Sequence, residues 1–163
     1  MRYDLLKQAF VATYTKALEF LNPSGWQGPF VISDGFVIRW IRGCLAIEAR
    51  MDPHDWAIGE YLCCLPAADE PGVWAVNQAG KTVRVPLMDF LTERERFDES
   101  LQWYWAEYRA VFQGKNRRET LRKMYTVEDF SEVCTKQSEL VAAVLRKYGS
   151  SIFACAREKF GCS

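Results

Sequence analysis

The spacing of apolar residues divides the chain into a helix, a sheet and a second helical region. Over residues 2–21 the apolar positions recur at helical spacing, which predicts an amphipathic helix. These positions are Leu6, Phe10, Ala17 and Leu21. The dipeptide Asn22-Pro23 ends the helix, because a residue that precedes proline is disfavoured in the α region.

The region from residue 29 to residue 86 has the pattern of an antiparallel meander. Short runs of β-branched, aromatic and other apolar residues alternate with turn sequences. Asp34-Gly35 lies between two such runs and is a strong hairpin signal, and Arg42-Gly43 and Asp52-Pro53 mark the next two turns. We therefore expect an antiparallel sheet of about four to six strands.

Alternation along the predicted strands separates two faces of this sheet. Ile38 and Trp40 point to one side, which is apolar. The other side is mixed, because it carries Arg39 on one strand and Glu48 and Arg50 on the next. We expect the apolar face to pack against helices and the mixed face to be partly exposed to water.

After the sheet the apolar period changes from two to about 3.6 residues, so residues 87–161 are predicted to be helical. We expect a long helix over Thr126–Tyr148, ended by Gly149, and a short final helix over residues 151–160. The sequence thus predicts a single α+β domain over residues 1–163. In this fold the N-terminal helix and the helical C-terminal half cover one face of the sheet.

Charge and hydropathy exclude several classes of partner. The 163 residues include 21 Lys and Arg against 21 Asp and Glu, so the formal net charge is zero. A protein dedicated to nucleic acid or to an anionic membrane surface has a clear basic excess, so we expect neither partner. The basic cluster Lys115–Lys123 is interpreted as a solvated connector. No apolar run approaches the length of a membrane span.

The chain contains six cysteines, and none of them forms a Cys-x-x-Cys pair. The first residues, Met-Arg-Tyr-Asp-Leu-Leu-Lys, have no apolar signal-peptide core. We therefore expect a cytoplasmic protein with six reduced thiols and no intrachain disulfide. We also expect no cofactor, since neither a Gly-x-Gly-x-x-Gly motif nor a Walker A motif is present.

His54 is the one histidine, and it lies in a predicted turn between two aspartates. A single histidine with scattered cysteines does not make a structural zinc site, and no Gly-x-Ser-x-Gly elbow is present. Asp34 followed by Glu48-x-Arg50 is similar to the Asp…Glu-x-Lys pattern of metal-dependent nucleases, but arginine replaces the lysine. We favour a solvated turn for His54 and hairpin chemistry for Asp34, with no metal site.

Trp103 is the strongest candidate for a binding anchor in the helical region. On a helix that starts at Asp98, Trp103 lies about 200° from the apolar position of Leu101, at about 100° per residue. Either a neighbouring element covers this tryptophan, or it is exposed and anchors a partner. In the second case we expect Arg96 and Glu107 to form part of a polar rim.

The order of a leading helix, a short antiparallel sheet and a helical C-terminal half resembles that of the small α+β immunity proteins with which bacteria neutralise toxins. The resemblance covers the whole chain in architecture and includes no diagnostic motif. It implies a non-enzymatic protein, monomeric or homodimeric, that occludes the site of a protein partner such as a toxin domain. The candidate binding residues are Arg39, Glu48, Arg50, His54, Arg96, Trp103 and Glu107.

The alternative is a small-molecule-binding protein or an enzyme with a pocket between the sheet and the helices. In that case we expect His54 to act with Asp52 and Asp55 or with Glu48. A deep pocket with converging polar groups favours this alternative, whereas a broad exposed patch favours a protein partner.

Overall fold

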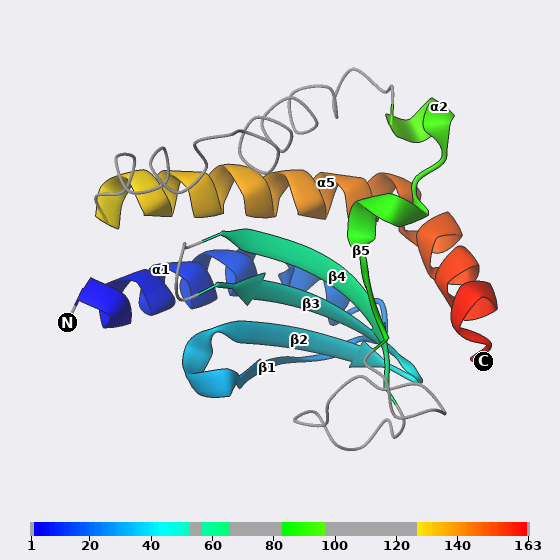
Figure 1. Ribbon diagram of the computed structural model, residues 1–163, viewed down its shortest axis with the longest axis horizontal. Helices are drawn as coiled ribbons and strands as arrows, with labels where there is room; N and C mark the ends of the chain where they lie inside the picture. The colour runs from blue at the N-terminus through cyan, green and yellow to red at the C-terminus, as the bar shows by residue number, and fades with distance from the viewer. Residues whose placement is uncertain (1, 53–56, 66–82, 97–126, 163) are drawn as a thin grey trace.

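The computed structural model describes residues 2–52, 57–65, 83–96 and 127–162, which form an α+β domain, as predicted (Figure 1). Its five strands make one antiparallel sheet in the order β1-β2-β3-β4-β5. The elements are α1 (Arg2–Ala17), η1 (Glu19–Leu21), β1 (Gln27–Ile32), η2 (Ser33–Gly35), β2 (Val37–Arg42), β3 (Leu45–Met51), β4 (Ile58–Cys64), β5 (Arg84–Pro86), η3 (Leu87–Phe90), α2 (Glu93–Arg96) and α5 (Val127–Phe160). None of the described helices is long and apolar enough to cross a membrane.

Helices α1 and α5 pack against each other and cover one face of the sheet, which we call the inner face (Figure 1). The helix predicted over residues 2–21 corresponds to α1 together with the short 3-10 helix η1. One hydrophobic core joins the inner face to both helices. It includes Ile38, Trp40, Ile47 and Leu62 from the sheet and Leu6, Phe10, Tyr14, Phe130 and Val141 from the helices. Full burial of a large apolar side chain contributes about 1.5–3 kcal/mol.

Two of the predicted turns connect neighbouring strands directly. Between β1 and β2, Asp34 and Gly35 have left-handed backbone angles, with φ of 55° and 84°. Lys7 of α1 donates a hydrogen bond of 2.9 Å to the Asp34 carboxylate. Gly43, with φ of 61°, reverses the chain between β2 and β3, where only glycine has no steric penalty. The third predicted turn follows β3, and its residues 53–56 lie outside the described part of the chain.

The opposite face of the sheet, the outer face, is buried at its centre and half-buried toward its edges. A second, smaller core on this face contains Ile41, Ala46, Cys63 and Leu65. The charged side chains of Arg39 and Glu48 are buried as well, with exposed fractions of 2% and 0%. The prediction of a partly exposed face therefore holds for Arg50 and Arg84, with exposed fractions of 24% and 18%, but is wrong for Arg39 and Glu48. An arginine and a carboxylate that pair with each other can be buried together.

Helix α5 is continuous over 34 residues, from Val127 to Phe160. The prediction that Gly149 ends one helix, with a second helix after it, is wrong. Gly149 is buried within α5, and a Cβ atom there would lie 3.3 Å from the ring of Phe153. The glycine therefore permits close packing of this ring and does not serve as a helix cap. Figure 1 shows the C-terminal part of α5 turning away from the axis of its first part.

A disulfide joins Cys44, in the turn after β2, to Cys162, which follows α5, across 118 residues of sequence. The prediction of six free thiols is therefore wrong. The pair forms because the fold brings the end of α5 to the β2–β3 turn, and the spacing of cysteines along the sequence carries no sign of this. The free cysteines are Cys63, Cys64, Cys134 and Cys155.

Candidate functional site

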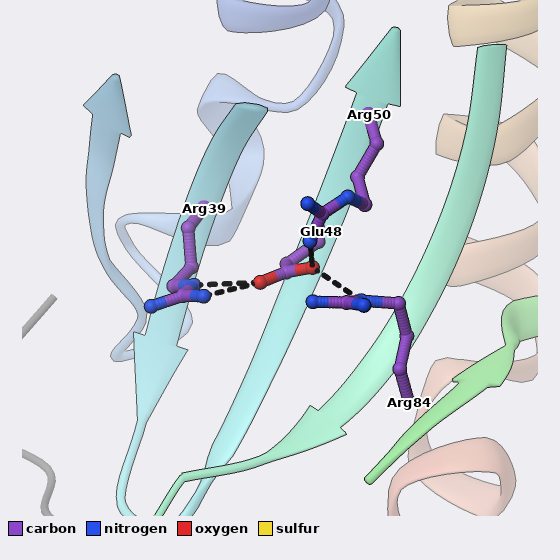
Figure 2. Close-up of polar contacts among 4 residues, drawn as sticks. All are labelled: Arg39, Glu48, Arg50 and Arg84. Atoms are coloured by element: carbon purple, nitrogen blue, oxygen red, sulfur yellow. Dashed lines mark hydrogen bonds and ion pairs between the residues drawn. The ribbon is translucent and has the colours of Figure 1, made fainter. Parts of the chain in front are cut away.

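Three of the residues predicted to bind a partner lie together on the outer face, and a further arginine joins them (Figure 2). Glu48 of β3 accepts hydrogen bonds from Arg39 of β2 at one carboxylate oxygen, where Arg39 Nε lies at 2.9 Å. Its other oxygen lies 3.0 Å from both Arg50 Nη1 and Arg84 Nε. We call these four residues the outer-face cluster.

The strand register explains how the outer-face cluster forms. Arg39 lies directly opposite Glu48 in the β2–β3 ladder. Arg50 is two residues further along β3, so its side chain points to the same face. Arg84 reaches the carboxylate from β5, two strands away. The sequence signal for Arg84 is a single arginine in a short β-branched run, but its place beside Glu48 depends on the pairing of β5 with β4.

The outer-face cluster keeps Glu48 ionised. Burial alone would raise the pKa of the Glu48 carboxyl, but the hydrogen bond from Arg39 and the positive charges of all three arginines outweigh burial and lower this pKa. Cys63 of β4 lies beside the same carboxylate, and burial together with the charge of Glu48 raises the pKa of its thiol. The cluster therefore supplies neither a general base nor a reactive thiolate at neutral pH.

The rest of the predicted binding surface falls mostly outside the described residues. His54, Asp55, Trp103 and Glu107 all lie there. Arg96 is the last residue of α2. The anchor role of Trp103 and the pocket role of His54 therefore stay predictions.

The structure does not join Asp34 and Glu48 into one ligand set. Each carboxylate has its own basic partners, which are Lys7 for Asp34 and the three arginines for Glu48. The side chain of Asp34 is 85% exposed in its turn, whereas Glu48 is completely buried. Within the described ranges, no three His, Cys, Asp or Glu side chains form a group that could hold a metal ion.

A second group of arginines lines a pocket of about 410 Å³ where η1, the loop before β1, the end of β2 and α5 meet. The basic residues are Arg42 of β2 and Arg146 and Arg157 of α5. Ser24 and Ser150 add two hydroxyl groups to the wall. We call this cavity the α5 pocket and its three arginines the pocket arginines.

Aromatic rings support two of the pocket arginines. The guanidinium carbon of Arg42 lies 5.6 Å from the ring centroid of Trp26, and that of Arg146 lies 4.3 Å from the ring centroid of Phe20. Trp26 in turn packs against Phe153, with 4.9 Å between ring centroids. All three rings line the α5 pocket. Stacking on an aromatic face is favourable for a guanidinium group and restricts its rotamers.

The α5 pocket concentrates positive charge in a protein of zero net charge. In the part of the chain that the structure describes, no acidic side chain lines the pocket. Nor does any described acidic residue form an ion pair with Arg42, Arg146 or Arg157. Arg42 donates one hydrogen bond, from Nη1 to the backbone carbonyl of Ser24 at 3.3 Å. The arrangement suits an anion that comes from outside the chain.

The sequence reasoning missed the α5 pocket, although α5 carries a partial signal for it. Arg146, Gly149, Ser150, Phe153 and Arg157 occupy positions i, i+3, i+4, i+7 and i+11, which share one face of a helix. A helix end predicted at the glycine divides this face between two elements and hides the pattern. The sequence around Arg42, at the end of β2, does not indicate the pocket, because tertiary packing brings Arg42 close to α5.

Comparisons with known proteins do not assign the chain to a family. No protein-family model, curated protein or solved structure matches the chain. The resemblance to toxin-neutralising immunity proteins therefore stays a prediction. A function has to be inferred from the chemistry of the described residues.

Proposed function

We propose that the protein binds a small anionic molecule in the α5 pocket, and that binding rather than catalysis is its function. The observation that carries the proposal is the convergence of Arg42, Arg146 and Arg157 on one cavity with no acidic residue in its described lining. This function is related to the alternative from the sequence, a small-molecule-binding protein or enzyme with a pocket between the sheet and the helices. The residues differ from those predicted.

Electrostatics favours an anion at this place. Guanidinium groups around one cavity repel one another, and an anion between them removes that repulsion. Hydrogen bonds from arginine to a carboxylate or phosphate are charge-assisted and about twice as strong as neutral ones. Arg157 alone is explained by its place in the last turn of α5, where a positive charge is favourable. That explanation does not extend to Arg42 of β2 or to Arg146, which lies further from the helix end.

The groups in the α5 pocket favour binding over catalysis. Arginine is protonated at physiological pH and therefore cannot act as a base there. The Ser24 hydroxyl donates to the backbone carbonyl of Phe20 at 3.4 Å, so it is turned toward the chain. Among the described lining residues there is no histidine, lysine or carboxylate that could activate Ser24 or Ser150 as a nucleophile.

A protein partner is a separate proposal. An immunity-type function with a toxin domain as partner rests on architecture and on Trp103, and anion binding requires neither that partner nor a particular oligomeric state. We also propose that the protein is located in the cytoplasm. Thiols are kept reduced in that compartment, so the disulfide between Cys44 and Cys162 would be open there for much of the time.

Thermal unfolding in sodium phosphate and in sodium chloride of equal ionic strength tests anion binding. Phosphate stabilises many proteins through exclusion from their surface, so the comparison has to be made between variants. We expect phosphate to raise the Tm of the wild type but not that of Arg146→Gln/Arg157→Gln. The matched control is Lys147→Gln, which removes an exposed charge of α5 outside the pocket and should keep the effect. A ligand at about 100 times its Kd adds about 2.7 kcal/mol of stability.

Isothermal titration of phosphate into the same three proteins gives the affinity directly. The double variant should bind about tenfold more weakly or worse, which corresponds to a loss of about 1.4 kcal/mol or more. Equal phosphate effects in the wild type, the double variant and Lys147→Gln would attribute the stabilisation to surface exclusion. That result would contradict the proposal.

A further inference from the structure

Resting on the proposed anion site, we propose that the ligand of the α5 pocket is a phosphomonoester whose organic part is a flat aromatic group. The number of arginines points to phosphate. One arginine satisfies a carboxylate through a bidentate pair, so Arg42, Arg146 and Arg157 together exceed what a monocarboxylate needs. A phosphomonoester carries about −1.5 to −2 charges at pH 7 and three strong acceptor oxygens. These match three separate guanidinium groups.

The pocket has room for more than a phosphate ion. At about 30 Å³ per water, a cavity of about 410 Å³ has room for on the order of a dozen waters. Inorganic phosphate would replace only a few of them. Cavities of this volume are typical of sites for small organic ligands and cofactors. The remaining volume is therefore large enough for an organic part of the ligand.

The wall of the pocket selects a flat ring for this organic part. Phe20, Trp26 and Phe153 line the cavity beside the arginines. Arg146 is exposed, and its guanidinium carbon lies 4.3 Å from the ring centroid of Phe20. A guanidinium group stacks well on aromatic rings. A ligand ring packs against this aromatic wall, and the phosphate that it carries is held by Arg42, Arg146 and Arg157.

Four ligands separate the contribution of the phosphate from that of the ring: methyl phosphate, phenyl phosphate, acetate and benzoate. Isothermal titration is done at about pH 8, where both phosphates are dianions because their second pKa is about 6. We expect phenyl phosphate to bind about tenfold tighter than methyl phosphate or better. Each phosphate should also bind about tenfold tighter than the carboxylate with the same organic group.

Two variants and a control show which residues cause these differences in affinity between ligands. Phe20→Leu keeps an apolar side chain and removes the ring, so it should abolish the preference for phenyl over methyl phosphate. Its affinity for methyl phosphate should stay close to that of the wild type. Arg146→Gln should weaken the binding of both phosphates, and Lys147→Gln, on the same helix but outside the pocket, should weaken neither.

The possible outcomes distinguish this inference from the proposed function. Equal affinity for phenyl and methyl phosphate would overturn the aromatic part of the inference and leave an anion site in place. Equal affinity for phosphates and carboxylates would overturn the phosphate part. If none of the four ligands bound, both the inference and the proposed function would be contradicted.

Discussion

Three arginines gather in each of two regions of this molecule, and the regions differ in whether the chain supplies the anion. In the outer-face cluster, Glu48 accepts hydrogen bonds from Arg39, Arg50 and Arg84 (Figure 2). One nitrogen of this cluster, Nη2 of Arg84, is buried and has no acceptor among the described residues. In the α5 pocket no acidic residue belongs to the described lining, and aromatic rings support two of the arginines instead.

The comparison of the two clusters shows that burial decides the role of a group of arginines. A guanidinium group that is almost fully buried, such as that of Arg39, requires an internal carboxylate, because an unpaired buried charge is costly. The pocket arginines border an open cavity, where water solvates them and an internal ion pair would contribute little. The outer-face cluster therefore stabilises the fold. The pocket arginines, in contrast, are available to bind an external anion.

The largest effect that we expect is from Glu48→Gln, which removes the internal anion of the outer-face cluster. The substitution leaves Arg39 buried without its ion pair, and breaking a buried pair in this way costs about 3–5 kcal/mol. Urea unfolding at neutral pH measures this loss in the free energy of unfolding. Because the α5 pocket lies elsewhere, the Kd for phosphate should not change under conditions in which the variant is folded.

A matched control comes from an exposed ion pair of α5. Lys136 and Glu132 lie 2.9 Å apart, with exposed fractions of 56% and 64%. Glu132→Gln should cost less than about 0.5 kcal/mol, as is usual for exposed helical pairs. If Glu48→Gln were as mild as Glu132→Gln, the claim that the outer-face cluster is structural would be wrong.

A smaller effect is expected from the double substitution Cys44→Ser/Cys162→Ser. The disulfide spans 118 residues and restricts the unfolded chain, so its loss should cost about 2–4 kcal/mol. It also ties the turn beside Arg42 to the end of the helix that carries Arg157, so phosphate should bind more weakly to the variant. The strand ladder holds the outer-face cluster independently of this bond.

Denaturant unfolding and phosphate titration measure both effects. Cys155→Ser, which changes an exposed free thiol of α5, provides the control and should change neither quantity. An unchanged phosphate affinity in the double variant would show that the disulfide does not organise the pocket.

The smallest effect that we expect is a pH dependence of the stability that the outer-face cluster contributes. The pKa of Glu48 is lower in the folded protein than in the unfolded chain, where a glutamate has a pKa of about 4.3. Its contribution is therefore fully present above about pH 4.3 and is lost as pH falls through the lower folded pKa. The stability difference between the wild type and Glu48→Gln should shrink over this acid range. A difference that stays constant down to acid unfolding would contradict the assignment.

The sheet and much of the outer-face cluster could be predicted from the sequence because both depend on local patterns. A period of two along the strands and turn residues such as Asp34 and Gly43 specify the first hairpins. The same alternation puts Arg39, Glu48 and Arg50 on one face. The burial of Arg39 and Glu48 was not predictable in this way, since alternation shows which residues share a face and not whether that face is covered.

The α5 pocket and the disulfide could not be predicted because both depend on how distant elements pack. Arg42 approaches Arg146 and Arg157 only when α5 lies against the end of the sheet. The same packing brings Cys44 to Cys162. Gly149 also misled the prediction, because a glycine near a helix end in sequence is usually a cap, whereas this one makes room for a ring.

Arginine side-chain NMR during a phosphate titration tests the comparison between the two clusters most directly. The Nε–H signal of each arginine reports on its own hydrogen bonding, so the six arginines can be followed in one experiment. We predict that the signals of Arg42, Arg146 and Arg157 shift together and saturate with one Kd, while those of Arg39, Arg50 and Arg84 stay in place. Unchanged signals from the pocket arginines, or equal shifts in both clusters, would contradict an anion site in the α5 pocket.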